Sequence, residues 1–143
     1  MANLHSYLHF NGNCEAAFNQ YKAVFGGEFS TLSRYKDVPP GSPVPEGEEA
    51  NWIMHVSLPV GPNSILMGSD RPSHLGPGLR GNLGYIYITA DSRDEATRIF
   101  QGLSAGGQVQ MPLEDTFWGS YFGMCEDKFG VLWMIGYDAP RPS

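Results

Sequence analysis

The chain has 143 residues, of which 41% are hydrophobic and 17% are charged, the composition of one ordinary globular domain. Its formal net charge is −6 and Lys and Arg total nine, with no basic run, so the sequence carries no electrostatic footprint for nucleic acid. No stretch approaches the roughly 20 apolar residues of a membrane span and no secretion signal is visible. We therefore expect a cytoplasmic protein that binds neither nucleic acid nor membranes.

The first half of the chain predicts a strand, a helix and three further strands. Residues 4–10 alternate as a strand does, and residues 13–25 form an amphipathic helical pattern that ends at Gly26 and Gly27. A glycine pair suits a helix end, because glycine adopts the left-handed conformation that closes a helix. Residues 36–49 are too rich in proline for a regular strand. The further strand-like runs of this half are 28–34, 52–58 and 64–69.

The second half repeats this order. Glu15-Ala16 recurs 80 positions later as Glu95-Ala96, and the glycine pair recurs as Gly106-Gly107. Ser92 is a suitable N-cap with Glu95 three residues on, a capping box, and Asn13 can cap the first helix. The elements predicted for this half are a strand at 83–89, a helix at 92–105, and strands at 108–111, 121–125 and 131–137.

The predicted fold class is therefore α+β, with the order β-α-β-β-β present twice in one domain. Module one spans residues 4–70, a linker rich in Gly and Pro spans 71–82, and module two spans 83–138. Each module is too short to bury its own sheet face. We expect the two modules to pair, within one chain or across a dimer.

The first strand of each module presents two different faces. In the second module Ile86 and Ile88 share one face, and Tyr85, Tyr87 and Thr89 share the other. The same offset places Ser6 and Leu8 with the isoleucines, and His5, Tyr7 and His9 with the tyrosines. Because a helix needs an apolar sheet face to cover, the Ile/Leu face is expected to pack on it. The His/Tyr face is then left to line a cavity.

Two cysteines, Cys14 and Cys125, lie far apart in the sequence without a CxxC motif, so a disulfide is not expected in a reducing compartment. Cys14 falls at a predicted helix start, where a lowered thiol pKa is one alternative. A small, half-buried residue is the other, which we favour. Asp127-Lys128-Phe129-Gly130 is typical of a β-turn, and Trp133 and Met134 are expected to pack in the core.

Two motifs resemble the PhnB-like proteins of the vicinal oxygen chelate superfamily, which includes glyoxalases, bleomycin-resistance proteins and extradiol dioxygenases. The first motif is Phe-Asn-Gly-Asn-Cys-Glu-Ala-Ala at residues 10–17. The second combines Glu-Asp-Thr-Phe-Trp-Gly at 114–119 with Asp-Lys-Phe-Gly-Val at 127–131. The resemblance extends from about residue 4 to 137. It implies two βαβββ modules forming a curved mixed sheet around a cleft, commonly in a homodimer.

The resemblance also implies where a metal would bind, since metal-dependent members hold a divalent ion with His and Glu from four strands. The first-strand positions fall on His5, or on Ser6 if the turn is shorter, and on Tyr85. The last-strand positions fall near Met67 and Met134. Only His5 is a plausible ligand there, because a thioether suits Mg, Mn, Ni or Zn poorly. The sequence therefore predicts no metal at the expected site and no cofactor.

The candidate ligand-binding residues are aromatic side chains with polar groups. Tyrosine suits a mostly apolar pocket that needs a few polar anchors, although strand propensity also explains it. Phe117 and Trp118 belong to an aromatic run, Thr116 to Phe122, that either closes over a cleft or packs in the core or a dimer contact. A histidine near neutral pKa can act as a polar handle or general base. The predicted set is His5, Tyr7, His9, Tyr85, Tyr87, Phe117 and Trp118.

Three functions remain open. The favoured hypothesis is a metal-independent protein that binds a small, partly aromatic or apolar molecule as a homodimer. The alternative is a metal-dependent lyase, isomerase or dioxygenase acting on a small vicinal-oxygen substrate. The third is a dimeric interaction module with a filled cavity. A nucleophile elbow, a P-loop and a dinucleotide-binding turn are missing from the sequence. A phosphonate ligand would require Arg34, Arg71 or Arg80 to turn inward.

Overall fold

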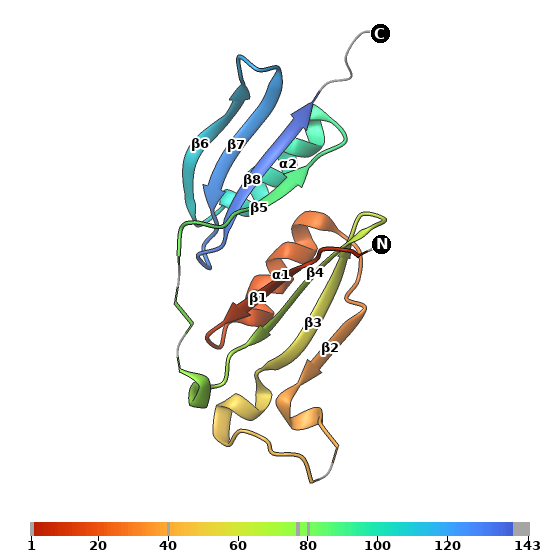
Figure 1. The fold of residues 1–143 in the computed structure, drawn as a ribbon, viewed down its shortest axis with the longest axis vertical. Helices are drawn as coiled ribbons and strands as arrows, with labels where there is room; N and C mark the ends of the chain where they lie inside the picture. The colour runs from red at the N-terminus through yellow and green to blue at the C-terminus, as the bar shows by residue number, and fades with distance from the viewer. Residues whose placement is uncertain (1, 40, 77, 80, 139–143) are drawn as a thin grey trace. The chain divides into compact units, whose positions relative to one another are not determined.

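The computed structural model describes residues 2–39, 41–76, 78–79 and 81–138. It divides the chain into two compact units, residues 1–79 and 80–143 (Figure 1). Each unit contains one helix and one four-stranded mixed sheet, so the predicted α+β fold with a repeated β-α-β-β-β order is confirmed, as two sheets. No helix in the described ranges is long and apolar enough to cross a membrane.

The first unit has the strand order β1-β4-β3-β2. Strand β1 pairs with β4 in parallel, and the other pairs are antiparallel. Short 3₁₀ turns, at 35–37 and 47–51, occupy the proline-rich connection between β2 and β3, and a third lies at 73–75. The bounds are β1 Ser6–Phe10, α1 Cys14–Phe25, β2 Thr31–Arg34, β3 Ile53–Val60 and β4 Ser64–Asp70.

The second unit repeats this topology with the order β5-β8-β7-β6. Strand β5 pairs with β8 in parallel, and β8-β7 and β7-β6 are antiparallel. The strand expected at 108–111 continues to Asp115, with register shifts that accommodate Pro112 on this edge strand. The bounds are β5 Ile86–Thr89, α2 Arg93–Ser104, β6 Gln108–Asp115, β7 Ser120–Glu126 and β8 Leu132–Asp138.

Each helix packs on one face of its own sheet (Figure 1). A glycine lets the two layers approach closely in both units. A Cβ atom at Gly68 of β4 would lie 2.6 Å from the ring of Phe18 in α1, and one at Gly123 of β7 would lie 2.9 Å from the ring of Phe100 in α2. Both phenylalanines are buried, so these contacts form the centre of the two cores.

A buried aspartate organises the backbone in each unit. The carboxylate of Asp70, which is 1% exposed, accepts hydrogen bonds from the backbone N–H groups of Gly12, Cys14 and Ile53, each at 2.9 Å. It thereby takes the capping position at α1 that was expected of Asn13, whose side chain makes no capping hydrogen bond. The prediction for Asn13 was wrong because Asp70, distant in sequence, brings a charged acceptor to the same N–H groups.

The buried aspartate of the second unit is Asp127, which lies in the turn between β7 and β8. It accepts hydrogen bonds from the backbone N–H groups of Phe129 and Val131 and from the indole Nε1–H of Trp133. The N–H of Gly130 donates to the carbonyl of Asp127 at 3.0 Å. The predicted β-turn and the predicted burial of Trp133 are therefore confirmed. The same prediction was wrong for Met134, which is only half-buried because strand alternation places it on the face opposite Trp133.

The cap of α2 follows the sequence prediction in part. The hydroxyl of Ser92 accepts a hydrogen bond from the N–H of Glu95 at 3.0 Å. The carboxylate of Glu95 returns to the N–H of Asp91, at 2.9 Å, instead of the N–H of Ser92 that a capping box would use.

Both cysteines are fully buried and free. Burial raises the pKa of the Cys14 thiol, and Asp70 and Glu15 raise it further by charge repulsion. The alternative of a lowered Cys14 pKa is therefore wrong, because desolvation outweighs the favourable position at a helix start. Burial, with Asp127 nearby, also raises the pKa of Cys125, to about 12.

Candidate functional site

The helix-free face of each sheet carries the candidate residues. Along β1, Tyr7 and His9 are exposed while Leu8 is half-buried, and along β5, Tyr87 is exposed while Ile86 and Ile88 are half-buried. Side chains alternate between the two faces of a strand, so the tyrosines lie on the face opposite the more buried aliphatic residues.

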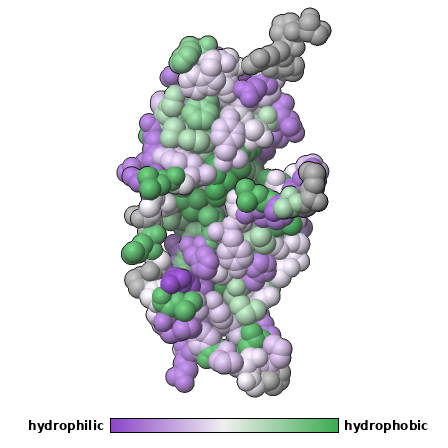
Figure 2. Space-filling view, in the orientation of Figure 1, coloured by the Kyte–Doolittle hydropathy of each residue, from purple (hydrophilic) through white to green (hydrophobic). Residues whose placement is uncertain are grey.

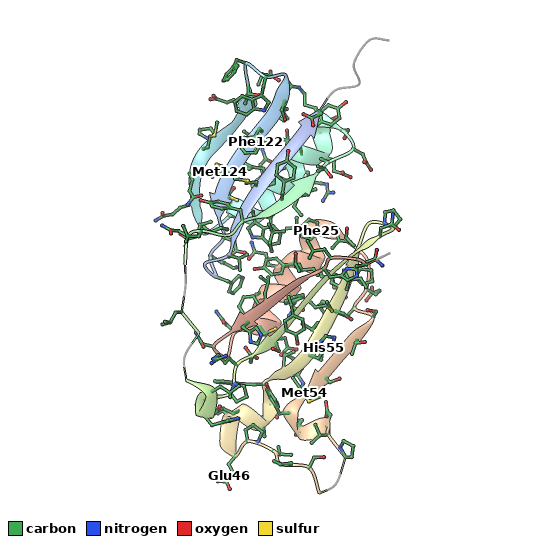
Figure 3. All side chains as sticks on the ribbon, viewed as in Figure 1. Phe25, Glu46, Met54, His55, Phe122 and Met124 are labelled. Carbon is green, nitrogen blue, oxygen red and sulfur yellow. The ribbon has the colours of Figure 1, made fainter. Side chains whose placement is uncertain are left out.

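In the first unit, folding brings His55 of β3 to Tyr7 of β1. The hydroxyl of Tyr7 lies 3.1 Å from Nδ1 of His55, within hydrogen-bonding distance. The two rings are nearly parallel, with centroids 5.6 Å apart, and the ring of His9 lies 5.5 Å from that of Tyr7. Tyr7 remains 43% exposed. The three side chains, which we call the Tyr/His cluster, combine ring surface with hydrogen-bonding groups on a partly exposed face. His55 is labelled in Figure 3.

In the second unit, four aromatic rings form a continuous chain of contacts. Tyr87 and Phe122 stack with centroids 6.2 Å apart, and Trp118 meets Phe122 at 6.1 Å. Phe117 meets Trp118 edge to face at 5.0 Å. We call Tyr87, Phe122 and Trp118 the aromatic shelf. It extends over β5, β7 and the turn that precedes β7. Phe122 of β7 is labelled in Figure 3.

The turn between β6 and β7 projects the last two rings into solvent. The hydroxyl of Thr116 donates to the carbonyl of Ser120 at 2.7 Å, and the N–H of Gly119 donates to the carbonyl of Thr116. Phe117 is 97% exposed and Trp118 53% exposed. Figure 2 shows hydrophobic atoms, in green, at the end of the second unit where this turn lies. The alternative of packing in the core is therefore wrong for Phe117.

A glycine leaves room for the aromatic shelf. Gly136 of β8 is buried beneath it, and a Cβ atom at this position would overlap the hydroxyl of Tyr87 and lie 3.7 Å from the ring of Phe122. Near the shelf, Ser120 is only 4% exposed, and its hydroxyl has no hydrogen-bond partner among the described residues. The shelf thus has one unused polar group beside a mainly apolar surface.

Two predicted residues stand apart from these clusters. The hydroxyl of Tyr85 donates to the side-chain oxygen of Gln110 at 2.8 Å, which ties the start of β5 to β6. His5 precedes β1 and is exposed. Their roles in binding stay predictions. His55 and Phe122 were not among the predicted site residues, because only the sheet register places them beside Tyr7 and Tyr87.

The arginines considered for a phosphonate ligand turn toward the protein. Arg34 binds the carboxylate of Glu15 at 2.7 Å, which holds the pKa of Glu15 below its ordinary value. Arg71 donates to the carbonyl oxygens of Leu75 and Gly76. Arg80 lies outside the described residues. Neither Arg34 nor Arg71 is therefore free to hold an anion.

Comparison with known proteins agrees with the fold of two repeated β-α-β-β-β units. The family model of the Glyoxalase/Bleomycin resistance protein/Dioxygenase superfamily matches residues 3–135. The chain belongs to this superfamily. Its resemblance to PhnB-like proteins is also confirmed among the solved structures, as the following comparisons show.

Three relatives span nearly the whole chain. The crystal structure of protein PA1353 from Pseudomonas aeruginosa is 38% identical, covers 96% of this chain and 98% of its own, and superimposes with a TM-score of 0.84. The Bacillus cereus structure named "Putative 3-demethylubiquinone-9 3-methyltransferase, PhnB protein" is 25% identical over 95% and 99% of the two chains, with a TM-score of 0.71. Protein YjdN of Escherichia coli (strain K12) is 29% identical over 98% of both chains.

In this superfamily member, methionines occupy the expected last-strand positions. Tyr7 is the register partner of Met67, and Tyr87 is the register partner of Met134, so each unit repeats a Tyr–Met pair beside the expected last-strand position. Thioethers are poor ligands for hard and borderline divalent ions. Within the described part of the chain, no group of three or more His, Cys, Asp or Glu side chains is arranged to hold a metal ion.

Proposed function

We propose that this superfamily member binds a small molecule on its helix-free sheet faces without a catalytic metal. One observation carries the proposal: in both units a methionine occupies the last-strand position expected of a metal ligand, and a tyrosine of the first strand is its register partner. The repeated pair offers an aromatic ring, a phenol and a polarisable thioether. These groups make contacts with an organic molecule and complete no metal cage.

The surroundings of the two tyrosines support this binding role. A ligand pocket combines much apolar surface with a few placed polar groups. The Tyr/His cluster provides hydrogen-bonding atoms at Tyr7, His9 and His55, and the aromatic shelf provides stacking area at Tyr87, Phe122 and Trp118. A molecule with a planar or apolar part and one or two polar groups is the ligand class that these surfaces fit.

The alternative function, a metal-dependent lyase, isomerase or dioxygenase, makes a different demand. It needs His5 to act with carboxylates as a set of ligands that leaves open coordination positions for two substrate oxygens. We do not extend the methyltransferase name of the Bacillus cereus structure to this chain. Each sheet contains one parallel strand pair, whereas a Rossmann-type cofactor site uses a mostly parallel sheet with a glycine-rich turn.

Elemental analysis discriminates the two functions. The protein is purified without chelators, and Mn, Fe, Ni and Zn are added back in turn. The binding proposal predicts metal at background level, and the same value for His5→Ala and for a His74→Ala control. About one tightly held ion per chain, lost in His5→Ala and kept in His74→Ala, would overturn the proposal in favour of the enzyme.

We also propose that the protein is a cytoplasmic homodimer. Leu4, Leu83 and Phe117 are large apolar side chains that are almost fully exposed, which is unfavourable for an isolated chain in water. The two buried free thiols suit a reducing compartment. Light scattering coupled to size-exclusion chromatography is expected to give twice the mass of the 15.7 kDa chain. A monomer at all concentrations would contradict the dimer.

A further inference from the structure

An unpaired carboxylate lies on the same face as the aromatic shelf. Glu114 of β6 is the register partner of Phe122 of β7, and antiparallel partners direct their side chains to the same face of the sheet. The next pair in the ladder, Asp115 and Tyr121, faces the helix, since Arg93 of α2 binds Asp115 and stacks on the Tyr121 ring at 4.0 Å. Glu114 and Phe122 therefore face away from α2.

The neighbouring carboxylates Glu114 and Asp115 differ in whether an arginine pairs with them. Arg93 holds Asp115 through two guanidinium nitrogens, so this carboxylate is neutralised. Glu114 is exposed and makes no hydrogen bond or ion pair with the residues that the structure describes. Glu114 is thus a carboxylate without an ion-pair partner among the described residues, and it lies beside the aromatic rings.

The rest of this face favours a positively charged ligand as well. The faces of aromatic rings carry partial negative charge and attract cations, most strongly for Trp and Tyr. Met124, labelled in Figure 3, and its register partner Met134 lie beside the shelf and add polarisable sulfur. The described basic residues of this unit lie on α2 or in the β7–β8 turn: Arg93, Arg98 and Lys128.

We propose that the aromatic shelf, with Glu114, is a binding site for an organic cation such as a quaternary or aromatic ammonium group. This inference rests on the proposed small-molecule function and names its ligand class. The cation lies against the rings of Trp118 and Tyr87 and is neutralised by the carboxylate of Glu114. An anionic ligand is disfavoured at the same surface by the carboxylate and by the ring faces.

The proposal is tested with three soluble probes: benzyltrimethylammonium, benzyl alcohol and benzoate. Each is titrated into ¹⁵N-labelled protein while the indole signal of Trp118 and the amide signals of β5 and β7 are followed. The cation is expected to bind most tightly. Glu114→Gln is expected to weaken the cation about three- to tenfold and to leave benzyl alcohol unchanged, since only the charge interaction is removed.

Asp115→Asn is the matched control, because it removes the same charge from the adjacent residue on the opposite face. If both variants reduce the affinity for the cation equally, the proposal is overturned. The cation would then respond to the net charge of the whole protein and not to a carboxylate beside the shelf. Benzyl alcohol or benzoate binding as tightly as the cation would also overturn it, yet leave small-molecule binding intact. If no probe moves the signals of the shelf, the result counts against both the cation site and a binding role for this face.

Discussion

The hydroxyl of Tyr7 on β1 lies 3.1 Å from Nδ1 of His55 on β3, with their rings stacked at 5.6 Å. Strand β4 lies between β1 and β3 in the sheet, so this contact crosses a whole strand. It places a phenol and an imidazole on the face that α1 leaves open.

Replacing Tyr7 with phenylalanine tests this pair. Tyr7→Phe removes the hydroxyl and keeps the ring, so the tautomer balance of His55 is expected to change while the fold is kept. The imidazole ¹⁵N shifts of His55 report the tautomer directly. Tyr85→Phe is the control, because the hydroxyl of Tyr85 donates to Gln110 instead. Identical His55 shifts in wild type and Tyr7→Phe would show that the hydrogen bond is absent in solution.

Asp70 is expected to be among the residues on which stability depends most. In the wild type, backbone N–H groups donate to both carboxylate oxygens of Asp70. In Asp70→Asn, an NH₂ group replaces one of these acceptor oxygens and faces a backbone N–H donor. The free energy of unfolding is expected to fall by about 2–4 kcal/mol, measured in urea. Asp94→Asn, at an exposed position in the first turn of α2, is expected to cost less than about 1 kcal/mol. Equal losses in the two variants would contradict the capping role of Asp70.

Gly136→Ala is expected to disturb the aromatic shelf more than the fold. The new Cβ would overlap the hydroxyl of Tyr87, the end of a side chain that can rotate into solvent. We expect a loss of stability of about 1 kcal/mol or less, together with large shifts of the Tyr87 and Phe122 ring signals. Gly84→Ala is the control, since a Cβ there meets no atom within 4 Å. Unchanged ring signals in Gly136→Ala would disprove the close approach.

The buried thiols predict a loss of stability at alkaline pH. Burial raises the pKa of Cys125 from its ordinary value of 9.0 to about 12, so the folded state favours the protonated thiol. A raised pKa stabilises the fold fully below pH 9, and this contribution disappears as the pH rises from about 9 to about 12. The stability of wild type is therefore expected to fall toward that of Cys125→Ala over this range. A constant difference between the two proteins would contradict the burial of a neutral thiol.

Much of the fold follows from local sequence signals. The strand and helix patterns, the glycine pairs and the 80-residue repeat predict both modules, because alternation and helical periodicity are local properties. The ends of the strands are less predictable: β5 begins at Ile86 instead of residue 83, and β6 continues to Asp115 past Pro112. Pairing with a neighbouring strand decides where each strand ends, and the sequence of one strand does not show which residues it pairs with.

The sequence predicts on which face of the sheet the candidate residues lie, but not which residues they contact. Alternation places Tyr7, His9 and Tyr87 on the more exposed side of their strands. The contacts of His55 and Phe122 depend on strand order and register, which pair residues 48 and 35 positions apart in sequence with Tyr7 and Tyr87. The cap of α1 was missed for the same reason, because its acceptor, Asp70, comes from the end of β4.

The central claim, ligand binding without a metal, is tested most directly by an NMR screen of small organic molecules against chelator-treated, ¹⁵N-labelled protein. We expect at least one molecule to shift the signals of the Tyr/His cluster or the aromatic shelf in a saturable way, with the same affinity after Mn, Fe, Ni or Zn is added. Shifts of these signals that arise only in the presence of a metal would contradict it.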